Sequence, residues 1–170
     1  MRVIANTTII SNFATVGHLH LLKMLWNPLY ISEQVFSEIQ AGFNQGYSFY
    51  AGIEQHIFPL SPDGWLHLTS LQSTDEFRLY GQLLGKLHDG EASCLSIAHH
   101  RQWTFLSDDR ATRQKGQQLK VPISGTLGAL LLLVKRQNLS LPDANALLQE
   151  MITIGGYYSP VTSLNEILKL

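Results

Sequence analysis

Residues 103–110 have the sequence Trp-Thr-Phe-Leu-Ser-Asp-Asp-Arg, in which an apolar run ends abruptly in two carboxylates. Such a run predicts a strand over Trp103–Ser107, followed by a polar helix that begins near Asp109. A second apolar run, Val3–Ala5, ends in Asn6-Thr7-Thr8 and predicts another buried strand. Because ligands of open parallel sheets bind beyond the carboxyl ends of the strands, these two polar stretches are where we look for a functional site.

Working outward from these two segments, strands and helices alternate along the chain. Further strands are predicted at Leu29–Ile31, Trp65–Leu68 and Val121–Ile123. Helical spacing of apolar residues predicts helices near 9–16, 19–25, 33–39, 77–87, 89–100, 111–119, 125–135 and 141–154. Strands separated by helices predict an α/β fold, a three-layer α/β/α sandwich with a central parallel sheet. We expect one domain over residues 1–170, with an irregular aromatic and Gly-rich insertion at about 41–64.

The composition excludes several classes of protein. Of 170 residues, 45% are hydrophobic and 15% are charged, with a net charge of -1, so the chain is neither disordered nor a non-specific coat for nucleic acid. A single cysteine rules out a disulfide framework and fits a reducing compartment. The N-terminus turns polar at Asn6, and the longest apolar run, Ala129–Val134, is far below the roughly 20 residues that span a bilayer. We therefore expect a cytoplasmic protein with no membrane segment.

Four acidic residues are candidates for chemistry. Glu91 lies on the same helix face as Leu95, where a carboxylate is uncommon unless something binds it, although an acid in a first helical turn is also ordinary. Asp108 and Asp109 either cap the next helix or form part of a site. Glu38 lies beside an apolar stripe, where a solvated edge residue is the alternative. Together with Asn6, the set Glu38, Glu91 and Asp109 offers the oxygen ligands that Mg²⁺ or Mn²⁺ prefers.

Basic residues gather in the same half of the chain. Eight of the twelve Lys and Arg residues lie between Lys86 and Arg136. Arg110 and Arg113 are three residues apart on one predicted helix, so they share a face and are placed to reach a phosphate backbone near the acids. A solvated helix flank is the alternative interpretation of this pair.

Five segments in this order resemble motifs of the PIN domain family, and of its prokaryotic toxin-like subgroup. They are Val-Ile-Ala-Asn-Thr-Thr (3–8), Ile-Ser-Glu-Gln-Val-Phe-Ser-Glu-Ile (31–39), Leu-His-Asp-Gly-Glu-Ala (87–92), Phe-Leu-Ser-Asp-Asp-Arg-Ala-Thr-Arg (105–113) and Ser-Gly-Thr-Leu-Gly (124–128). The resemblance implies a nuclease that uses Mg²⁺ or Mn²⁺ to hydrolyse phosphodiester bonds of single-stranded RNA. It also implies an antitoxin protein as a partner.

Carried over residue by residue, the resemblance makes Glu38, Glu91 and Asp109 the second, third and fourth acids of the family site. Asp108 is adjacent, and the resemblance gives Thr7 or Thr8, and Ser107, the role of hydroxyls that orient the acids.

The chain departs from the family at the first acid, where Asn6 replaces an aspartate. An amide has no charge for a cation and cannot act as a base. Two functions therefore stay open: a ribonuclease of reduced activity, or a non-catalytic module that binds RNA or a protein partner. The aromatic stretch from Phe43 to Phe58 and the low charge also suit a homodimer, unless these aromatics pack over the sheet.

Overall fold

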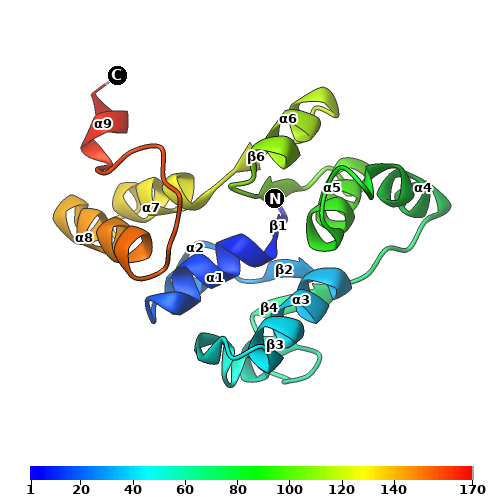
Figure 1. Cartoon of the computed structure of the whole chain (residues 1–170), viewed down its shortest axis with the longest axis horizontal. Coiled ribbons are helices and arrows are strands. Elements are labelled where there is room, and N and C mark those ends of the chain that lie inside the picture. Colours follow the sequence, from blue (N-terminus) through cyan, green and yellow to red (C-terminus); the bar gives the residue numbers. More distant parts are fainter. Residues whose placement is uncertain (170) are drawn as a thin grey trace.

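The computed structural model describes residues 1–169, in which short strands alternate with helices (Figure 1). The strands are β1 (Val3–Ala5), β2 (Leu29–Ser32), β3 (Ile57–Phe58), β4 (Leu66–Thr69), β5 (Thr104–Leu106) and β6 (Ile123–Ser124). The helices are α1 (Thr7–Thr15), α2 (His20–Leu25), α3 (Glu33–Asn44), α4 (Thr74–Leu83), α5 (Asp89–Arg101), α6 (Arg110–Gln118), α7 (Thr126–Lys135), α8 (Leu141–Thr153) and α9 (Asn165–Leu168). Two short 3₁₀ helices are η1 (Ser48–Tyr50) and η2 (Ile53–His56).

The strands form one parallel sheet in the order β3-β4-β2-β1-β5-β6. β1 lies at the centre, where Ile4 pairs with Tyr30 of β2 and with Phe105 of β5. Because parallel neighbours require crossover connections, the helices pack on both faces of the sheet. The predicted three-layer α/β/α fold with a central parallel sheet is therefore confirmed.

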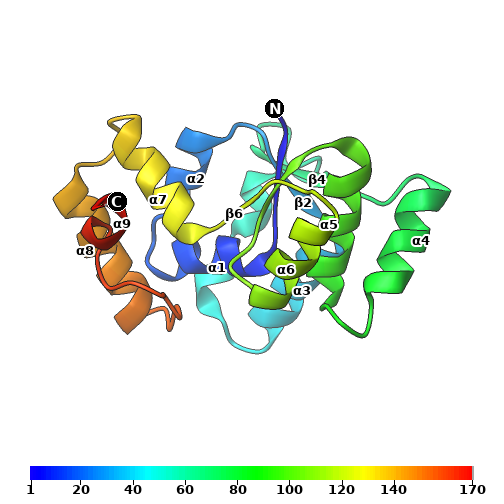
Figure 2. The ribbon, with the colours of Figure 1, turned by 90° about the horizontal axis from the view of Figure 1, so that it is seen from above.

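The order of the strands brings the ends of β1 and β5 together at the middle of the sheet. β1 leads directly into α1 and β5 into α6, so both helices begin at the same sheet edge. Figure 2 shows α7, α8 and α9 at one end of the molecule and α4 at the other, with β1 and α1 between them. Among the described helices, none is long and apolar enough to span a membrane.

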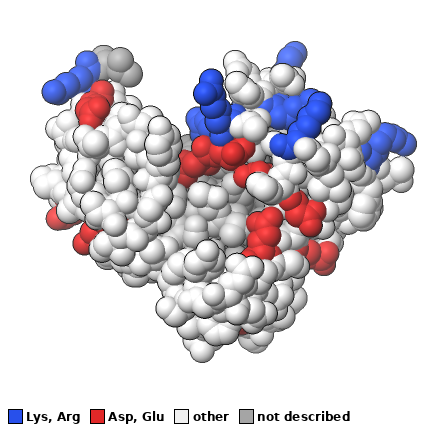
Figure 3. Space-filling model, viewed as in Figure 1, with Lys and Arg blue, Asp and Glu red and all other residues white. Residues whose placement is uncertain are grey.

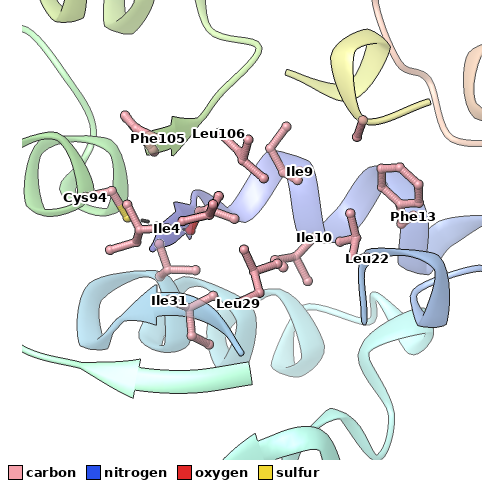
Figure 4. Close-up of a cluster of buried hydrophobic side chains, with 14 of the residues drawn as sticks. Ile4, Ile9, Ile10, Phe13, Leu22, Leu29, Ile31, Cys94, Phe105 and Leu106 are labelled. Carbon is pink, nitrogen blue, oxygen red and sulfur yellow. Dashed lines mark hydrogen bonds between the residues drawn. The ribbon is translucent and has the colours of Figure 1, made fainter. Parts of the chain in front are cut away.

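The core is built on the three central strands (Figure 4). Ile4, Ile31 and Phe105 are each fully buried, and the side chains of α1 and α5 pack around them. Val3–Ala5 is buried at every position, which explains its continuous apolar run without alternation. Cys94, the single cysteine, is fully buried on α5.

The segment 41–64 is more regular than the sequence indicated. α3 continues to Asn44, η1 and η2 follow, and β3 adds a strand at the edge of the sheet. The two residues of β3 are too few to produce a detectable alternation, and the strand is revealed by the pairing of Ile57 with Leu66 and of Phe58 with His67 of β4. The aromatic side chains of this segment were predicted either to pack over the sheet or to form a partner surface. Tyr50 is buried, as the first interpretation requires, while Tyr47 and Phe43 are about half exposed, as the second requires.

α4 and α9 differ most from the helices that the sequence predicts. α4 begins at Thr74, because the Ser73 hydroxyl accepts a hydrogen bond from the Glu76 amide and the Glu76 carboxylate accepts one from the Ser73 amide. It ends at Leu83, four residues earlier than the apolar spacing indicated. α9 was not predicted, because four residues are too few to show a helical period.

Candidate functional site

Asn6 joins the ends of the two central strands. Its side chain is almost fully buried, and its oxygen accepts a hydrogen bond from the Ile9 amide (3.2 Å), which caps α1. Its amide nitrogen donates to the Ser107 hydroxyl (3.0 Å), and that hydroxyl also accepts from the Asp109 amide (3.2 Å). Both polar atoms of Asn6 are therefore engaged within the protein, and Ser107 links them to Asp109.

Glu38 anchors the start of α5. One of its carboxylate oxygens accepts a hydrogen bond from the Thr7 hydroxyl, and the other accepts from the Gly90 amide (2.7 Å). A Cβ atom at position 90 would lie 2.7 and 2.8 Å from these two oxygens, so only glycine allows the carboxylate to approach. Of the two predicted hydroxyls, Thr7 contacts an acid, whereas Thr8 is exposed and donates to none within residues 1–169.

Glu91 lies one residue further along α5, next to Asp109. Its carboxylate accepts a hydrogen bond from the His88 amide (3.1 Å), and its second oxygen has no hydrogen-bond partner among the described residues. Burial raises the pKa of Glu91, and the negative charges of Asp109 and Glu38 raise it further. The hydrogen bond from the His88 amide and the charge of the His88 ring lower this pKa, but they do not outweigh the other effects. Glu91 therefore lies close enough to Asp109 and to Glu38 for their charges to repel its own.

Asp109 begins α6 and turns one oxygen to the helix. That oxygen accepts a hydrogen bond from the Thr112 amide (2.7 Å), so Asp109 does cap α6, the alternative that the sequence left open beside a role in the site. Its other oxygen, like that of Glu91, has no hydrogen-bond partner in the described part of the chain. The acid therefore caps a helix and still presents an oxygen to a ligand.

Within residues 1–169, no Lys or Arg forms an ion pair with this cluster of Glu38, Glu91 and Asp109. The ion pairs found between residues 1 and 169 join Arg78 to Asp75 and Arg101 to Glu76, and neither pair lies in the cluster. Figure 3 shows acidic side chains gathered in a hollow of the molecule, with basic side chains on the surface beside it. Uncompensated neighbouring carboxylates destabilise a fold, which makes them good candidates for binding a cation.

Asp108 faces a different set of partners. Its carboxylate accepts from the amide and the hydroxyl of Thr126 (2.9 and 2.6 Å) and from the side-chain amide of Asn12 (3.2 Å). A Cβ atom at Gly125 would lie 2.3 Å from one of its oxygens, so glycine is required at that position too. Asp108 thus ties β5 to the beginning of α7 and to α1, rather than capping the helix that follows it.

The donor set fits a magnesium ion with few protein ligands. Within residues 1–169, no three His, Cys, Asp or Glu side chains lie together as a ready ligand set. Mg²⁺ commonly takes only one or two carboxylates and completes its shell with waters and substrate phosphate. The free oxygens of Glu91 and Asp109 match that requirement, whereas Asn6 would have to release its helix cap to contribute.

Several residues near these acids were not singled out by sequence reasoning. Asn12 and Thr126 hold Asp108, and burial, together with the charge of Asp108, raises the pKa of Tyr157. Their signal in the sequence is weak, because all three lie far along the chain from Asp108. Arg110 and Arg113 are both exposed on α6 and line one cavity with Asp108, as their shared helix face indicated.

The fold and this edge define an α/β protein with an acidic site at the carboxyl ends of its central strands. A protein-family model described as a PIN domain matches residues 2–170. The chain therefore belongs to the PIN domain family, a nuclease-type family whose members generally use divalent metals and bind nucleic acid. No curated protein matches the chain.

Proposed function

We propose that this protein is a ribonuclease that hydrolyses single-stranded RNA with Mg²⁺ or Mn²⁺, at a rate reduced by Asn6. The observation that carries the proposal is the pairing of Glu91 with Asp109, two neighbouring carboxylates with a free oxygen each and no compensating cation in the described chain. Membership of a nuclease-type family supports the same assignment.

Glu91 and Asp109 would hold the ion. When bound, a divalent ion stabilises the charge that develops on phosphate and supplies an activated water. The other residues then have positioning roles. Glu38 fixes the start of α5 through Thr7 and Gly90, which sets the place of Glu91, and Ser107 fixes the start of α6, which sets the place of Asp109.

Arg110 and Arg113 would bind the phosphate backbone on either side of the cleaved bond. Arg110 makes no hydrogen bond or ion pair within the described residues, so its guanidinium is available. Arg113 donates to the Ser107 carbonyl (3.0 Å), which holds its side chain beside the site. Guanidinium groups recognise phosphate with two parallel hydrogen bonds, which suits this role.

The test is cleavage of a labelled single-stranded RNA with Mg²⁺ or Mn²⁺. We expect Glu91→Gln to lower the rate at least about tenfold to a hundredfold, which is the loss seen when even an outer partner of a metal ligand is removed. Glu150→Gln removes the same charge from an exposed site on α8 and is expected to leave the rate unchanged. Equal rates for Glu91→Gln and the unaltered protein, across several RNAs and both ions, would exclude the proposal.

A second candidate is a PIN module that binds RNA or a protein partner without catalysis. The observation that favours it is the engagement of Asn6, whose oxygen caps α1 and whose amide binds Ser107. A site with two carboxylates and no third ligand binds a divalent ion less strongly than a complete set. This candidate predicts RNA or partner binding that is independent of metal.

A toxin-like role, an antitoxin partner, a homodimer and a cytoplasmic location complete the proposal. They rest on the resemblance and the composition. Half-exposed aromatic side chains on and after α3, Phe43 and Tyr47, support a surface that a protein partner covers.

A further inference from the structure

A large open cavity lies beside the acidic site, between α6 and the segment that follows α8. Its volume is about 910 Å³, within the range of cavities that hold small organic ligands. Asp108, the residue before Asp109, forms part of its lining, so the cavity adjoins the start of α6, where Asp109 lies. Figure 3 shows the corresponding hollow, and Figure 1, in the same view, shows α6 on one side of it and α7, α8 and α9 on the other.

The two sides of the cavity differ in chemistry. α6 contributes Arg110, Arg113 and Gln114, and the opposite side contributes Tyr157 and Tyr158. Tyr158 is 95% exposed, an unusual state for a large aromatic side chain that no other part of the described chain contacts closely. Between these sides, apolar residues such as Leu127 line the cavity. An aromatic face, an apolar wall and cations at the rim suit a ligand that is flat, apolar on its faces and negatively charged at one end.

Polar groups in the cavity are free to contact such a ligand. The side-chain amides of Gln114 and Gln117 make no hydrogen bonds within residues 1–169, and both residues are exposed. Amide side chains recognise the edges of nucleobases. The one carboxylate of the lining, on Asp108, is occupied by Thr126 and Asn12, which limits its repulsion of an anion. A nucleotide matches each of these features.

We propose that this cavity binds the base of the RNA nucleotide next to the phosphate at the acidic site, with the base stacked on Tyr158. The inference rests on the proposed function, since a phosphate at Glu91 and Asp109 brings the neighbouring nucleotide to the cavity beside the start of α6. Arg110 and Arg113 line the cavity on α6, the helix that Asp109 begins, and bind the backbone of that nucleotide.

The test is the affinity of a fluorescent hexamer of uridine, compared with a hexamer of the same backbone without bases. Stacking of a base on an aromatic side chain contributes about 1–3 kcal/mol, so Tyr158→Ala is expected to weaken binding of the uridine hexamer about five- to a hundredfold. It should leave the affinity for the abasic hexamer unchanged, and Tyr158→Trp should restore the affinity for uridine. Anisotropy is measured with Mg²⁺ and again with EDTA, and a gel confirms that the hexamer stays intact.

Phe77→Ala is the matched control, because Phe77 is an exposed aromatic on α4, outside this cavity. If the unaltered protein binds RNA and Tyr158→Ala binds the uridine hexamer with the same affinity, the base site is overturned, but the proposed function stays intact. The cavity would then be a surface for a protein. Equal weakening toward the abasic hexamer also overturns stacking. If the unaltered protein binds neither hexamer in either condition, the base site and the proposed function both fail.

Discussion

Glu76 and Glu91 occupy the same position on two neighbouring helices but have opposite environments. Each is the third residue of its helix, α4 or α5, and each accepts a hydrogen bond from the amide of the residue that caps the helix. Burial raises the pKa of Glu76, but hydrogen bonds from Arg101 and from the Gln72 and Ser73 amides outweigh it and lower that pKa. Burial also raises the pKa of Glu91, and there the nearby acids Asp109 and Glu38 reinforce it.

Glu76 is therefore an acid that stabilises the fold, whereas Glu91 is an acid that is available for a ligand. Arg101 binds Glu76 with a nitrogen–oxygen distance of 2.7 Å, and the Glu76 side chain is only 4% exposed. Glu91 has no such cation among the described residues, so its charge remains unbalanced. Proteins tolerate this cost chiefly at functional sites.

The largest effect is expected from breaking the compensated pair. Glu76→Gln leaves the half-buried Arg101 without a negative partner and places an amide NH2 group against either the guanidinium or the Gln72 and Ser73 amides. We expect the free energy of unfolding to fall by about 3–5 kcal/mol, as for other buried pairs that lose one member. Urea unfolding monitored by circular dichroism measures this change.

Asp75→Asn is the control, since the Asp75–Arg78 pair is more than 60% exposed on both sides and should contribute less than about 1 kcal/mol. The effect of Glu76→Gln also depends on pH. Because the folded protein lowers the pKa of Glu76 below its usual 4.5, the stabilisation is complete above that value and is lost as pH falls through the lower folded pKa. A stability difference between Glu76→Gln and the unaltered protein that stays constant down to acid pH would contradict this account.

This comparison also shows what the sequence can and cannot predict. Local signals identified most elements, including Val3–Ala5 as a buried strand and the order of strands and helices that requires a parallel sheet. The same local signals make Glu76 and Glu91 look alike, because an acid in the first helical turn is common to both. Arg101, which distinguishes them, is 25 residues from Glu76 in the sequence and meets it only through packing of α4 on α5.

The candidate site was predictable only in part. Glu38, Glu91 and Asp109 were selected as a set, and Glu91 lies near enough to the other two for their charges to raise its pKa, but within residues 1–169 the three do not form a ready ligand set. The separate role of Asp108 was not predictable, because Thr126 and Asn12 come from α7 and α1, 18 and 96 residues away. The requirement for glycine at positions 90 and 125 likewise follows only from the carboxylates that approach them in space.

A second variant tests whether the cluster of acids is uncompensated, by adding one more carboxylate to it. Asn6→Asp places a carboxylate at a buried position whose neighbour, Ser107, also binds Asp109. In EDTA we expect the free energy of unfolding to fall by about 1–3 kcal/mol, because a further charge joins the cluster. With Mg²⁺ the loss should be recovered, and calorimetry should show tighter ion binding. Melting temperature in EDTA and in saturating Mg²⁺ measures both effects.

Asn44→Asp, at an exposed position near the end of α3, controls for the change in net charge. If Asn6→Asp raises both ion affinity and nuclease activity, the protein is an enzyme weakened by its asparagine. If it changes neither, the assignment of the ion to this edge is wrong.

The smallest effect is expected at Glu91, and its sign is opposite to that at Glu76. Glu91→Gln keeps a carbonyl oxygen for the His88 amide and removes a charge that Asp109 and Glu38 repel. In EDTA we expect stability to rise by about 1 kcal/mol or less, or roughly 2–4 °C in melting temperature for a domain of this size. With Mg²⁺ the gain should disappear, because the ion stabilises only the unaltered protein. A fall in melting temperature in EDTA would instead show that a partner compensates Glu91, as Arg101 compensates Glu76. The two helix starts would then be alike, and the acidic edge would lose its main physical reason for binding a cation.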